Sequence, residues 1–258
     1  MRGWFWKLVE ARPYLRGYLL MCQALASVLA DSGDEVVQAF SIWGNQSGMR
    51  TAAVLVSCFR WVTDREVGSA PFSAVDGMSG QKYRAMINRF AFLFGETRYL
   101  EIGSWKGSTL CSILSENSID AVVIDNWSEF GGPVNEFRSN LAHFVGESRV
   151  QVIESDWRDV DFACLGDFDV FLSDGPHDEA QQRDATAAGL VALKSTGLLV
   201  VDDWNWDYVR KATAEALQIA GRKLLFTIEV RTTLNNKHPE ISRGASDWHN
   251  GYLFAVVN

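Results

Sequence analysis

Cysteines are few in this sequence, and no two of them form a CxxC pair. The four, which lie far apart along the 258 residues, are Cys22, Cys58, Cys111 and Cys164. Because structural zinc sites and disulfide frameworks need closely patterned cysteines, the spacing argues against both. We expect reduced, buried thiols and a reducing, cytoplasmic location.

Long apolar runs and an excess of positive charge are also missing. The apolar run 18–30 has 13 residues, which is too short to span a bilayer. Charged residues and a proline interrupt the stretch before it, whereas a signal peptide has a continuous apolar core behind its basic start. The net charge of −8 argues against a nucleic acid as the main partner. The sequence therefore predicts a cytoplasmic chain without a membrane span.

The N-terminal part of the chain reads as helical, because apolar residues recur at a mixed spacing of three and four over residues 1–66. A loop rich in Gly, Ser and Ala follows at 67–80, and a helix is predicted over 81–95. We expect residues 1–75 to form a helical extension, or cap, on a main domain that spans 76–258. The aromatic residues of this extension make it a candidate homodimer surface.

From residue 98 onward, short apolar runs alternate with helical stretches. This alternation is typical of an α/β fold, and runs rich in Val, Ile, Leu and Phe favour a parallel sheet covered on both faces. The polar segment 231–250 is long for a connecting loop, and such loops are often functional lids. Seven strands are predicted, at 98–104, 121–127, 149–155, 168–174, 197–204, 223–230 and 251–258.

Each of the first five predicted strands ends in acidic residues. In an open α/β sheet, ligands bind in the crevice at the carboxyl ends of the strands. Solubility alone does not require acids at these positions, so the pattern predicts a binding site there. The acids are Glu101, Asp125, Glu154 with Asp156, Asp174, and Asp202 with Asp203.

The turn after the first of these strands reads EIGSWKGS at 101–108. Gly103 and Gly107 allow a tight turn and a close approach of the backbone to a ligand, and a helix that begins near Ser108 suits an anionic group. An ordinary strand-to-helix turn is the alternative. Asp125 lies where dinucleotide-type folds bind ribose hydroxyls. The glycine spacing differs from GxGxxG, which argues against a pyrophosphate cradle.

Together these segments resemble the class I S-adenosylmethionine-dependent methyltransferases. The stretch YLEIGSWKGSTL resembles their first motif, and VVIDNW resembles their acidic second motif. The region from FDVFLSDGPHDE to GLLVVDDW resembles the small-molecule O-methyltransferases of the macrocin and, more distantly, the catechol type, with a D-G-x-H motif. The resemblance covers residues 75–258 and implies a Rossmann-like, seven-stranded, mostly parallel sheet whose last strand is antiparallel.

The resemblance also implies which residues bind S-adenosylmethionine. Gly103 and Gly107 would flank its methionine part with Glu101 near the amino group, and the segment 76–80 would lie over the cofactor. Asp125 would bind the ribose, and the residues after it would lie along the adenosine. For the two tryptophans of the set, ordinary packing is the alternative. The full predicted set is Glu101, Gly103, Ser104, Gly107, Ser108, Asp125, Asn126, Trp127, Asp156, Trp157 and Asp174.

A second group of acids follows the fourth and fifth predicted strands, which are neighbours in a sheet of the expected order. Asp174, Asp202 and Asp203 would converge there, and converging carboxylates repel each other unless something neutralises them. A hard divalent cation such as Mg²⁺ does so through oxygen ligands. In the metal-dependent O-methyltransferases that the chain resembles, acids at these places hold the metal.

Methyl transfer to a hydroxyl needs a proton acceptor, because a neutral alcohol is a poor nucleophile. A metal lowers the pKa of a bound hydroxyl, and His177 is the candidate base, with Asp174 as the second catalytic residue. His177 lies where the catechol-type enzymes carry a lysine. Three other roles stay open for it, namely a metal ligand, a partner that orients Asp202, or a structural residue.

These features predict a metal-assisted O-methyltransferase that acts on a small hydroxylated molecule, such as a sugar or a sugar-bearing natural product. A metal-independent methyltransferase of the same fold is one alternative. A nicotinamide-dependent dehydrogenase is another, although the glycine spacing and the Asp202–Asp203 pair argue against it. A third is a module that binds the cofactor without catalysis, against which the joint presence of Asp174, His177 and the 202–203 pair argues.

Overall fold

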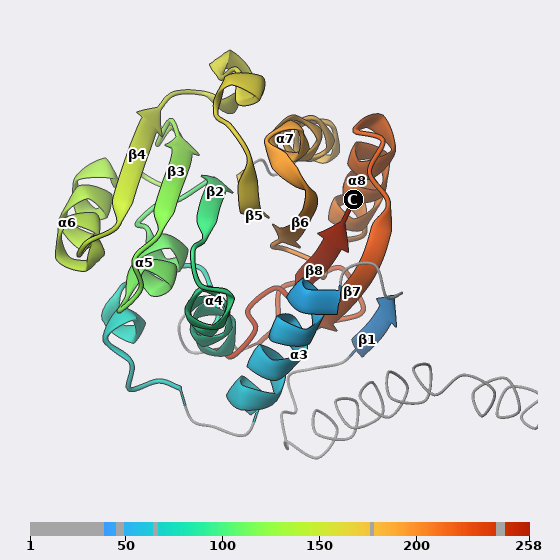
Figure 1. The fold of residues 1–258 in the computed structure, drawn as a ribbon, viewed down its shortest axis with the longest axis horizontal. Helices are drawn as coiled ribbons and strands as arrows, with labels where there is room; N and C mark the ends of the chain where they lie inside the picture. Colours follow the sequence, from blue (N-terminus) through green and yellow to red (C-terminus); the bar gives the residue numbers. More distant parts are fainter. Residues whose placement is uncertain (1–38, 45–48, 64–66, 176–177, 241–245) are drawn as a thin grey trace, which may run out of the picture.

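The chain folds around one eight-stranded sheet with helices on both faces (Figure 1). The computed structural model describes residues 39–44, 49–63, 67–175, 178–240 and 246–258. The α-helices are α3 (Met49–Thr63), α4 (Gln81–Phe94), α5 (Ser108–Leu114), α6 (Val134–Phe144), α7 (Glu179–Val191) and α8 (Asp207–Ile219). The strands are β1 (Ala39–Gly44), β2 (Arg98–Ile102), β3 (Asp120–Asp125), β4 (Arg149–Glu154), β5 (Phe168–Ser173), β6 (Leu193–Val201), β7 (Leu224–Arg231) and β8 (Tyr252–Val257).

The order of the strands in the sheet is β1-β7-β8-β6-β5-β2-β3-β4. The strands from β2 to β6 pair in parallel, whereas β8 is antiparallel to both of its neighbours, β6 and β7. All seven predicted strands are present, and the predicted α/β, Rossmann-like class with an antiparallel last strand is confirmed. Because β2 to β6 run in parallel, their carboxyl ends share one edge of the sheet.

The sheet has one strand more than predicted. The helical prediction for residues 1–66 is wrong at Ala39–Gly44, because this segment forms the edge strand β1 and pairs antiparallel with Phe226–Arg231 of β7. Periodicity alone cannot assign so short an apolar run to helix or strand, and the open hydrogen-bonding groups of an edge strand favour a partner. Helix α3 confirms the prediction for the segment that follows. Residues 1–38 lie outside the described part of the chain.

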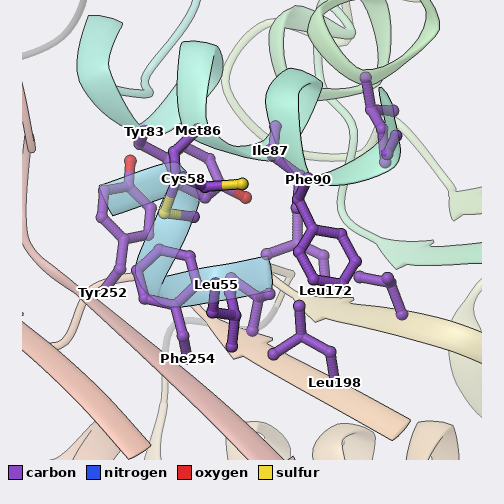
Figure 2. Close-up of a cluster of buried hydrophobic side chains, with 14 of the residues drawn as sticks. Leu55, Cys58, Tyr83, Met86, Ile87, Phe90, Leu172, Leu198, Tyr252 and Phe254 are labelled. Atoms are coloured by element: carbon purple, nitrogen blue, oxygen red, sulfur yellow. The ribbon is translucent and has the colours of Figure 1, made fainter. Parts of the chain in front are cut away.

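Alternating residues of the strands supply two hydrophobic cores, one on each face of the sheet. On one face, strand residues such as Leu172 and Leu198 pack under α3 and α4, which contribute Leu55 and Phe90 (Figure 2). On the other face, a second set of strand residues packs under α7 and α8. This set includes Leu100, Phe171, Leu199 and Leu253.

Strand β4 is the second edge of the sheet, and here the prediction of strands covered on both faces is wrong. None of the residues of β4 is buried, and Val152 is an exposed hydrophobic residue. The reason is position, because β4 has a partner strand only in β3. Helix α6, which follows β3 in the chain, buries one residue, Phe137.

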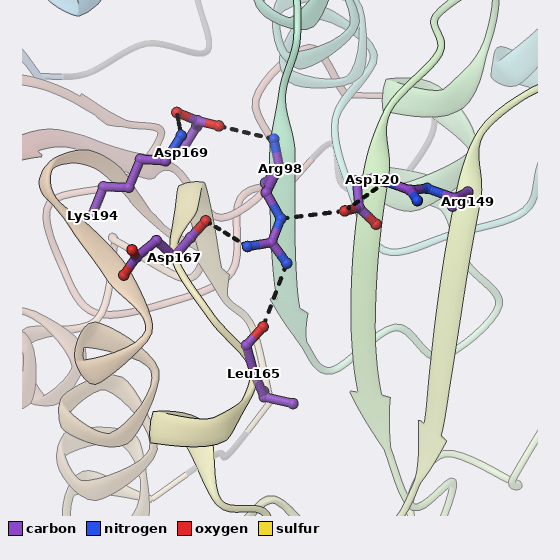
Figure 3. A network of polar contacts seen from close by, with 7 residues as sticks. All are labelled: Arg98, Asp120, Arg149, Leu165, Asp167, Asp169 and Lys194. Carbon is purple, nitrogen blue, oxygen red and sulfur yellow. Dashed lines mark hydrogen bonds and ion pairs between the residues drawn. The ribbon is translucent and has the colours of Figure 1, made fainter.

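Ionic contacts around Arg98, the first residue of β2, hold the amino ends of the parallel strands together (Figure 3). The guanidinium donates to the Asp120 carboxylate of β3 at 3.3 Å and to the Asp167 backbone oxygen at 2.9 Å. The backbone N–H of Arg98 donates to Asp169 of β5 at 3.0 Å, and Lys194 pairs with the same carboxylate at 2.6 Å. Since these contacts lie at the opposite end of the strands from the strand-end acids, they fix the sheet without occupying the crevice.

The cysteines follow the prediction in part. Cys58 and Cys111 are buried and free, and burial raises the pKa of both thiols to about 12. Cys164 is free but exposed, so the prediction of burial is wrong there, since it lies in the short surface helix 162–164 after β4. Cys22 lies outside the described residues. None of the helices in the described part of the chain is both long and apolar enough to cross a bilayer.

The division of the chain at residue 75 stays a prediction, and so does the homodimer surface in residues 1–75. Helix α3 precedes the proposed boundary and α4 follows it. The two helices contact each other and share the core that contains Leu55 and Phe90. The described part of the extension is therefore packed against the main domain.

Replacing Phe90 by Ala is expected to lower the free energy of unfolding by about 3–5 kcal/mol, because the fully buried ring would leave a cavity between α4 and the sheet. The matched control on the same helix is Phe92→Ala, whose ring is 61% exposed and whose loss should cost less than about 1 kcal/mol. Denaturation with guanidinium chloride measures both losses. Equal losses in the two variants would contradict this core.

Candidate active site

A cavity of about 520 Å³ lies at the carboxyl edge of the sheet and brings nearly all of the predicted site residues together. Of the predicted set, Gly107 does not line the cavity, and His177 lies outside the described residues. The sequence therefore located the cavity, whereas the role of each residue stays a prediction. The predicted residues in its wall are Glu101, Gly103, Ser104, Ser108, Asp125, Asn126, Trp127, Asp156, Trp157, Asp174, Asp202 and Asp203.

The turn between β2 and α5 needs glycine at two positions for different reasons. Gly103 has a φ of +86°, and a Cβ there would lie 2.1 Å from the backbone oxygen of Asp174. The ends of β2 and β5 are thus in direct backbone contact at the cavity. Gly107 has a φ of +80° and is the residue before α5 begins. Its left-handed conformation favours glycine, and a Cβ there would lie 3.0 Å from the Phe137 ring, which is not part of the cavity wall.

The carboxylate of Asp125 holds this turn in place. Its Oδ2 accepts hydrogen bonds from the backbone N–H groups of Ser104 and Trp105, both at 2.8 Å, and its Oδ1 accepts one from Trp127 at 2.7 Å. A carboxylate has about four acceptor positions, so three of them are occupied. The predicted ribose contact of Asp125 would therefore use the remaining position on Oδ1, because the turn already occupies Oδ2.

Glu101 lies at the base of the cavity with 1% of its surface exposed. Its carboxylate accepts hydrogen bonds from the Tyr99 hydroxyl at 2.5 Å and the Ser104 hydroxyl at 2.7 Å. Burial raises the pKa of Glu101 to about 7, although the two hydrogen bonds act in the opposite direction. Glu101 therefore titrates near neutral pH and gains most from a cationic ligand group that would stabilise its charged form.

At the end of β4, the Asp156 carboxylate is engaged by Arg158. The Arg158 guanidinium donates to both carboxylate oxygens, at 2.8 Å and 2.6 Å, and these bonds lower the pKa of Asp156 to about 2. Asn126 reaches the same carboxylate at 3.5 Å. Trp157 is half-buried beside them. Because the Arg158 side chain is 59% exposed, an adenine edge that contacts Asp156 would have to compete with a solvent-facing ion pair.

Trp127 and Trp105 both line the cavity, and Trp127 is the more deeply buried of the two. Trp127 is 7% exposed, packs on Phe137 with ring centres 4.9 Å apart, and donates its indole N–H to the Trp105 backbone oxygen at 2.7 Å. The packing alternative thus describes most of its side chain. Sequence reasoning missed Trp105 and Phe130, which also line the cavity and are joined by a hydrogen bond from the Trp105 indole. Trp105 lies inside the glycine turn, so the motif already contained that signal.

The second group of acids meets on the other side of the cavity. The carboxyl groups of Asp174 and Asp202 share a hydrogen bond. Burial, followed by the charge of Asp202, raises the pKa of Asp174 well above its ordinary range, and burial with the charge of Asp203 does the same for Asp202. Burial and the neighbouring charges therefore both favour the protonated form of this pair.

The long loop between β7 and β8 supplies residues that sequence reasoning missed or set aside. Asn250, which is 2% exposed, donates its amide to Asp203 Oδ1 at 2.6 Å. The amide oxygen of Asn250 in turn contacts His238 Nδ1 at 3.0 Å. His238, His249 and Asn250 all line the cavity. A lone Asn in a long loop carries no local pattern that would have marked it.

The three acids suit a metal ion in their donor chemistry but not in their positions. Three carboxylates give the hard oxygen donors that Mg²⁺ prefers. Their positions do not fit, however, because no group of three or more His, Cys, Asp or Glu side chains within the described ranges is arranged to hold an ion. Asp174 and Asp202 face each other through a hydrogen bond, while Asp203 is bonded to Asn250. The metal stays a prediction that the structure does not support.

Residues 100–204 match a family model that is described as a methyltransferase domain. The match runs from β2 to the end of β6 and so includes the glycine turn, Asp125 and the strand-end acids around the cavity. The predicted enzyme class, an S-adenosylmethionine-dependent methyltransferase, is confirmed at this level. The small-molecule O-methyltransferase branch and the role of the D-G-x-H motif stay predictions.

Several solved structures are similar to this methyltransferase at low identity. A putative O-methyltransferase from Klebsiella pneumoniae is 15% identical over 81% of this chain and 89% of its own, with a TM-score of 0.48. An O-methyltransferase from Bacillus cereus in complex with SAH is 14% identical over 80% and 91%, with a TM-score of 0.49. A cofactor-bound protein from MTB is 16% identical over 80% and 88%, with a TM-score of 0.49. No curated protein matches the sequence significantly.

Replacing Asp125 by Ala is expected to lower the free energy of unfolding by about 2–4 kcal/mol, because three backbone N–H groups lose a charged acceptor. Binding of S-adenosylhomocysteine should weaken as well, since the turn that shapes the cavity is released. The control is Asp120→Ala at the other end of β3, whose partly exposed ion pairs are worth about 1 kcal/mol or less. Denaturation and calorimetric titration provide the two readings, and equal effects in both variants would contradict the holding role of Asp125.

The affinity for S-adenosylhomocysteine is expected to rise about tenfold between pH 6 and pH 8, because the ionised fraction of Glu101 grows as the pH passes its pKa of about 7. The sign follows from the predicted contact, in which only the charged carboxylate attracts the ligand ammonium. Calorimetric titration over this pH range measures the slope. The variant Glu101→Gln should remove it, and a slope that persists in this variant would exclude Glu101 as its source.

Proposed function

We propose that this methyltransferase transfers the methyl group of S-adenosylmethionine to a hydroxyl oxygen of a small molecule, of the sugar or natural-product kind. The observation that carries the proposal is that one cavity joins two unlike walls. One wall comprises the glycine turn and the polar ends of β2, β3 and β4. The other comprises the buried acids Asp174 and Asp202 with Asp203. A methyl donor and a protonated acceptor need these two environments side by side.

The residues of the first wall fit the parts of the cofactor. Glu101 would bind the ammonium group, the backbone around Gly103 would pass close to the methionine chain, and Asp125 would contact the ribose. Asn126, Trp157 and Asp156 would lie along the nucleoside. Bound S-adenosylmethionine supplies a methyl group on a good leaving group, so the main task left to the protein is to position the acceptor hydroxyl and remove its proton.

The Asp174–Asp202 pair is suited to that proton. A carboxylate with a raised pKa is a stronger base than an ordinary one, and burial raises the pKa of both acids. In-line attack forms the new C–O bond as the C–S bond breaks, and the hydroxyl proton passes to the ionised carboxylate of the pair. Asn250 would orient Asp203 beside this pair through its amide hydrogen bond. His177, which lies outside the described residues, is the alternative base for the same proton.

We further propose that the acids bind Mg²⁺ or another divalent cation, with Asp174, Asp202 and Asp203 as ligands. Support comes from the donor chemistry alone, and binding would require the Asp174–Asp202 hydrogen bond to be replaced. The metal-independent alternative has its own support, because that hydrogen bond already neutralises part of the cluster. The partner proposed in either case is a small hydroxylated acceptor in the cytoplasm.

The proposal predicts that S-adenosylhomocysteine binds and that labelled methyl passes from S-adenosylmethionine to a member of a panel of small hydroxylated compounds. Asp202→Asn should reduce turnover on the order of 10²–10⁴-fold with little change in S-adenosylhomocysteine affinity. The control is Asp184→Asn, which alters an acid that lies on α7 outside the cavity wall. Absence of S-adenosylhomocysteine binding, with binding of a nicotinamide cofactor instead, would overturn the proposal.

The same assay with a chelator separates the two forms of the mechanism. Loss of turnover on adding EDTA, with recovery on adding excess Mg²⁺, is expected for the metal-assisted form. Turnover that EDTA leaves unchanged would assign the proton transfer to the protein side chains alone.

A further inference from the structure

Arg84 on α4 is a buried cation to which the reaction described above gives no role. The residue has no exposed surface. Its Nε donates to Ser79 Oγ at 2.8 Å and its Nη1 to the Val75 backbone oxygen at 2.7 Å, while its Nη2 has no hydrogen-bond partner. A buried guanidinium is costly to the fold unless an anion or a full set of acceptors compensates it. The position therefore favours an anionic group nearby.

The described protein side chains do not supply that anion by contact. Within the part of the chain that the structure describes, no carboxylate forms an ion pair with Arg84. Asp76, an acid close enough to influence it, has a 65% exposed side chain and pairs with Lys106 at 2.9 Å. Burial is the largest influence on the Arg84 pKa and lowers it. The guanidinium thus keeps an unused donor on Nη2, and within the described residues its charge has no carboxylate in direct contact.

Arg84 reaches the cavity through two serines. Ser79 and Ser108 both line the cavity, and their hydroxyl oxygens lie 3.0 Å apart. Ser79 Oγ already accepts from Arg84, so its own proton points either to Ser108 or into the cavity. If it points to Ser108, the Ser108 proton is left over. In each arrangement, the pair has a hydroxyl proton to donate to a ligand, and the guanidinium behind it strengthens that donor.

Gly77 keeps these groups close together. A Cβ on Gly77 would lie 2.1 Å from Ser108 Oγ and 2.6 Å from Arg84 Nη2, so the unused donor and the serine face the same point on the segment 76–80. Gly77 does not have a positive φ. Glycine is therefore needed here because a side chain would collide with Ser108 and Arg84, and not because of the backbone conformation. The close packing of the segment 76–80 against Ser108 and Arg84 thus holds the guanidinium directly behind the two serines of the cavity wall.

We propose that Arg84, acting through Ser79 and Ser108, forms the subsite for the carboxylate at the amino-acid end of S-adenosylmethionine. The inference rests on the proposed function, since it names the part of the cofactor that this wall receives. It also fits the wall around Glu101, which lines the same cavity and suits the neighbouring ammonium group. The serine pair, with Arg84 behind it, would receive the carboxylate of an α-amino acid, and the buried Glu101 would receive its ammonium group.

The test compares S-adenosylhomocysteine with its decarboxylated analogue, which keeps the ammonium and the nucleoside and lacks only the carboxylate. We expect the wild-type chain to bind S-adenosylhomocysteine about 10–100-fold more tightly than the analogue. In Arg84→Met, this ratio should fall to within about threefold, while the affinity for the analogue stays near the wild-type value. Calorimetric titration at constant pH gives both constants. The matched control is Arg89→Met on the same helix, whose guanidinium lies over the Trp61 and Phe92 rings and whose ratio should not change.

Unchanged affinity for the analogue also reports that Arg84→Met is folded. If that variant does not fold, Ser79→Ala provides the same reading, because it removes the link between the guanidinium and the cavity. A wild-type ratio near one, or a wild-type ratio retained in the variants, would overturn the carboxylate subsite while leaving the methyltransferase proposal intact. A wild-type chain that binds neither compound would overturn both.

Discussion

Three backbone N–H groups from two different turns donate to one carboxylate, that of Asp125, and the shape of the cavity depends on this contact. Two of the three donors, Trp105 and Trp127, have positive φ values of 46° and 48°, which for residues other than glycine cost about 1–3 kcal/mol each. Charged hydrogen bonds of this kind contribute about as much. The carboxylate thus offsets the strain of both turns, and the turns in turn place Gly103 against the end of β5.

The acids on the opposite wall have the reverse effect on stability. Asp174 and Asp202 are buried beside each other, so burial and mutual repulsion raise the pKa of both acids, and the fold bears the cost of desolvating any charge that they keep. The amide of Asn250 fixes Asp203 from a different loop. Packing alone would favour apolar residues at these strand ends. Groups whose pKa values are perturbed in this way, inside a cavity, are typical of sites that act on protons.

The sequence allowed the sheet and the position of the site to be predicted because both follow from local patterns. Apolar runs mark β2 to β8, and parallel strands bring their terminal acids to one edge. Other features depend on partners far apart in the chain. Asn250 bonds to Asp203 across 47 positions, Arg98 links three strands, and β1 gains its hydrogen bonds from β7. The hydrogen bond that Arg84 donates to Ser79, and those that Asp125 accepts from the two turns, likewise become visible only in the structure.

The buried charges of the cavity respond differently to pH. Burial raises the pKa of Glu101 to about 7 and raises the pKa values of Asp174 and Asp202 as well, so the neutral forms of these acids are favoured in the absence of a cation. A ligand with an ammonium and a sulfonium stabilises the ionised carboxyls, and the protons leave as it binds. Arg84 cannot release its charge in the same way, because a guanidinium stays protonated. In the proposed subsite, the wall behind Ser79 would thus favour an anion over a wide pH range, whereas the carboxyl walls would favour cations more strongly as the pH rises, and this difference would orient a ligand that carries both charges.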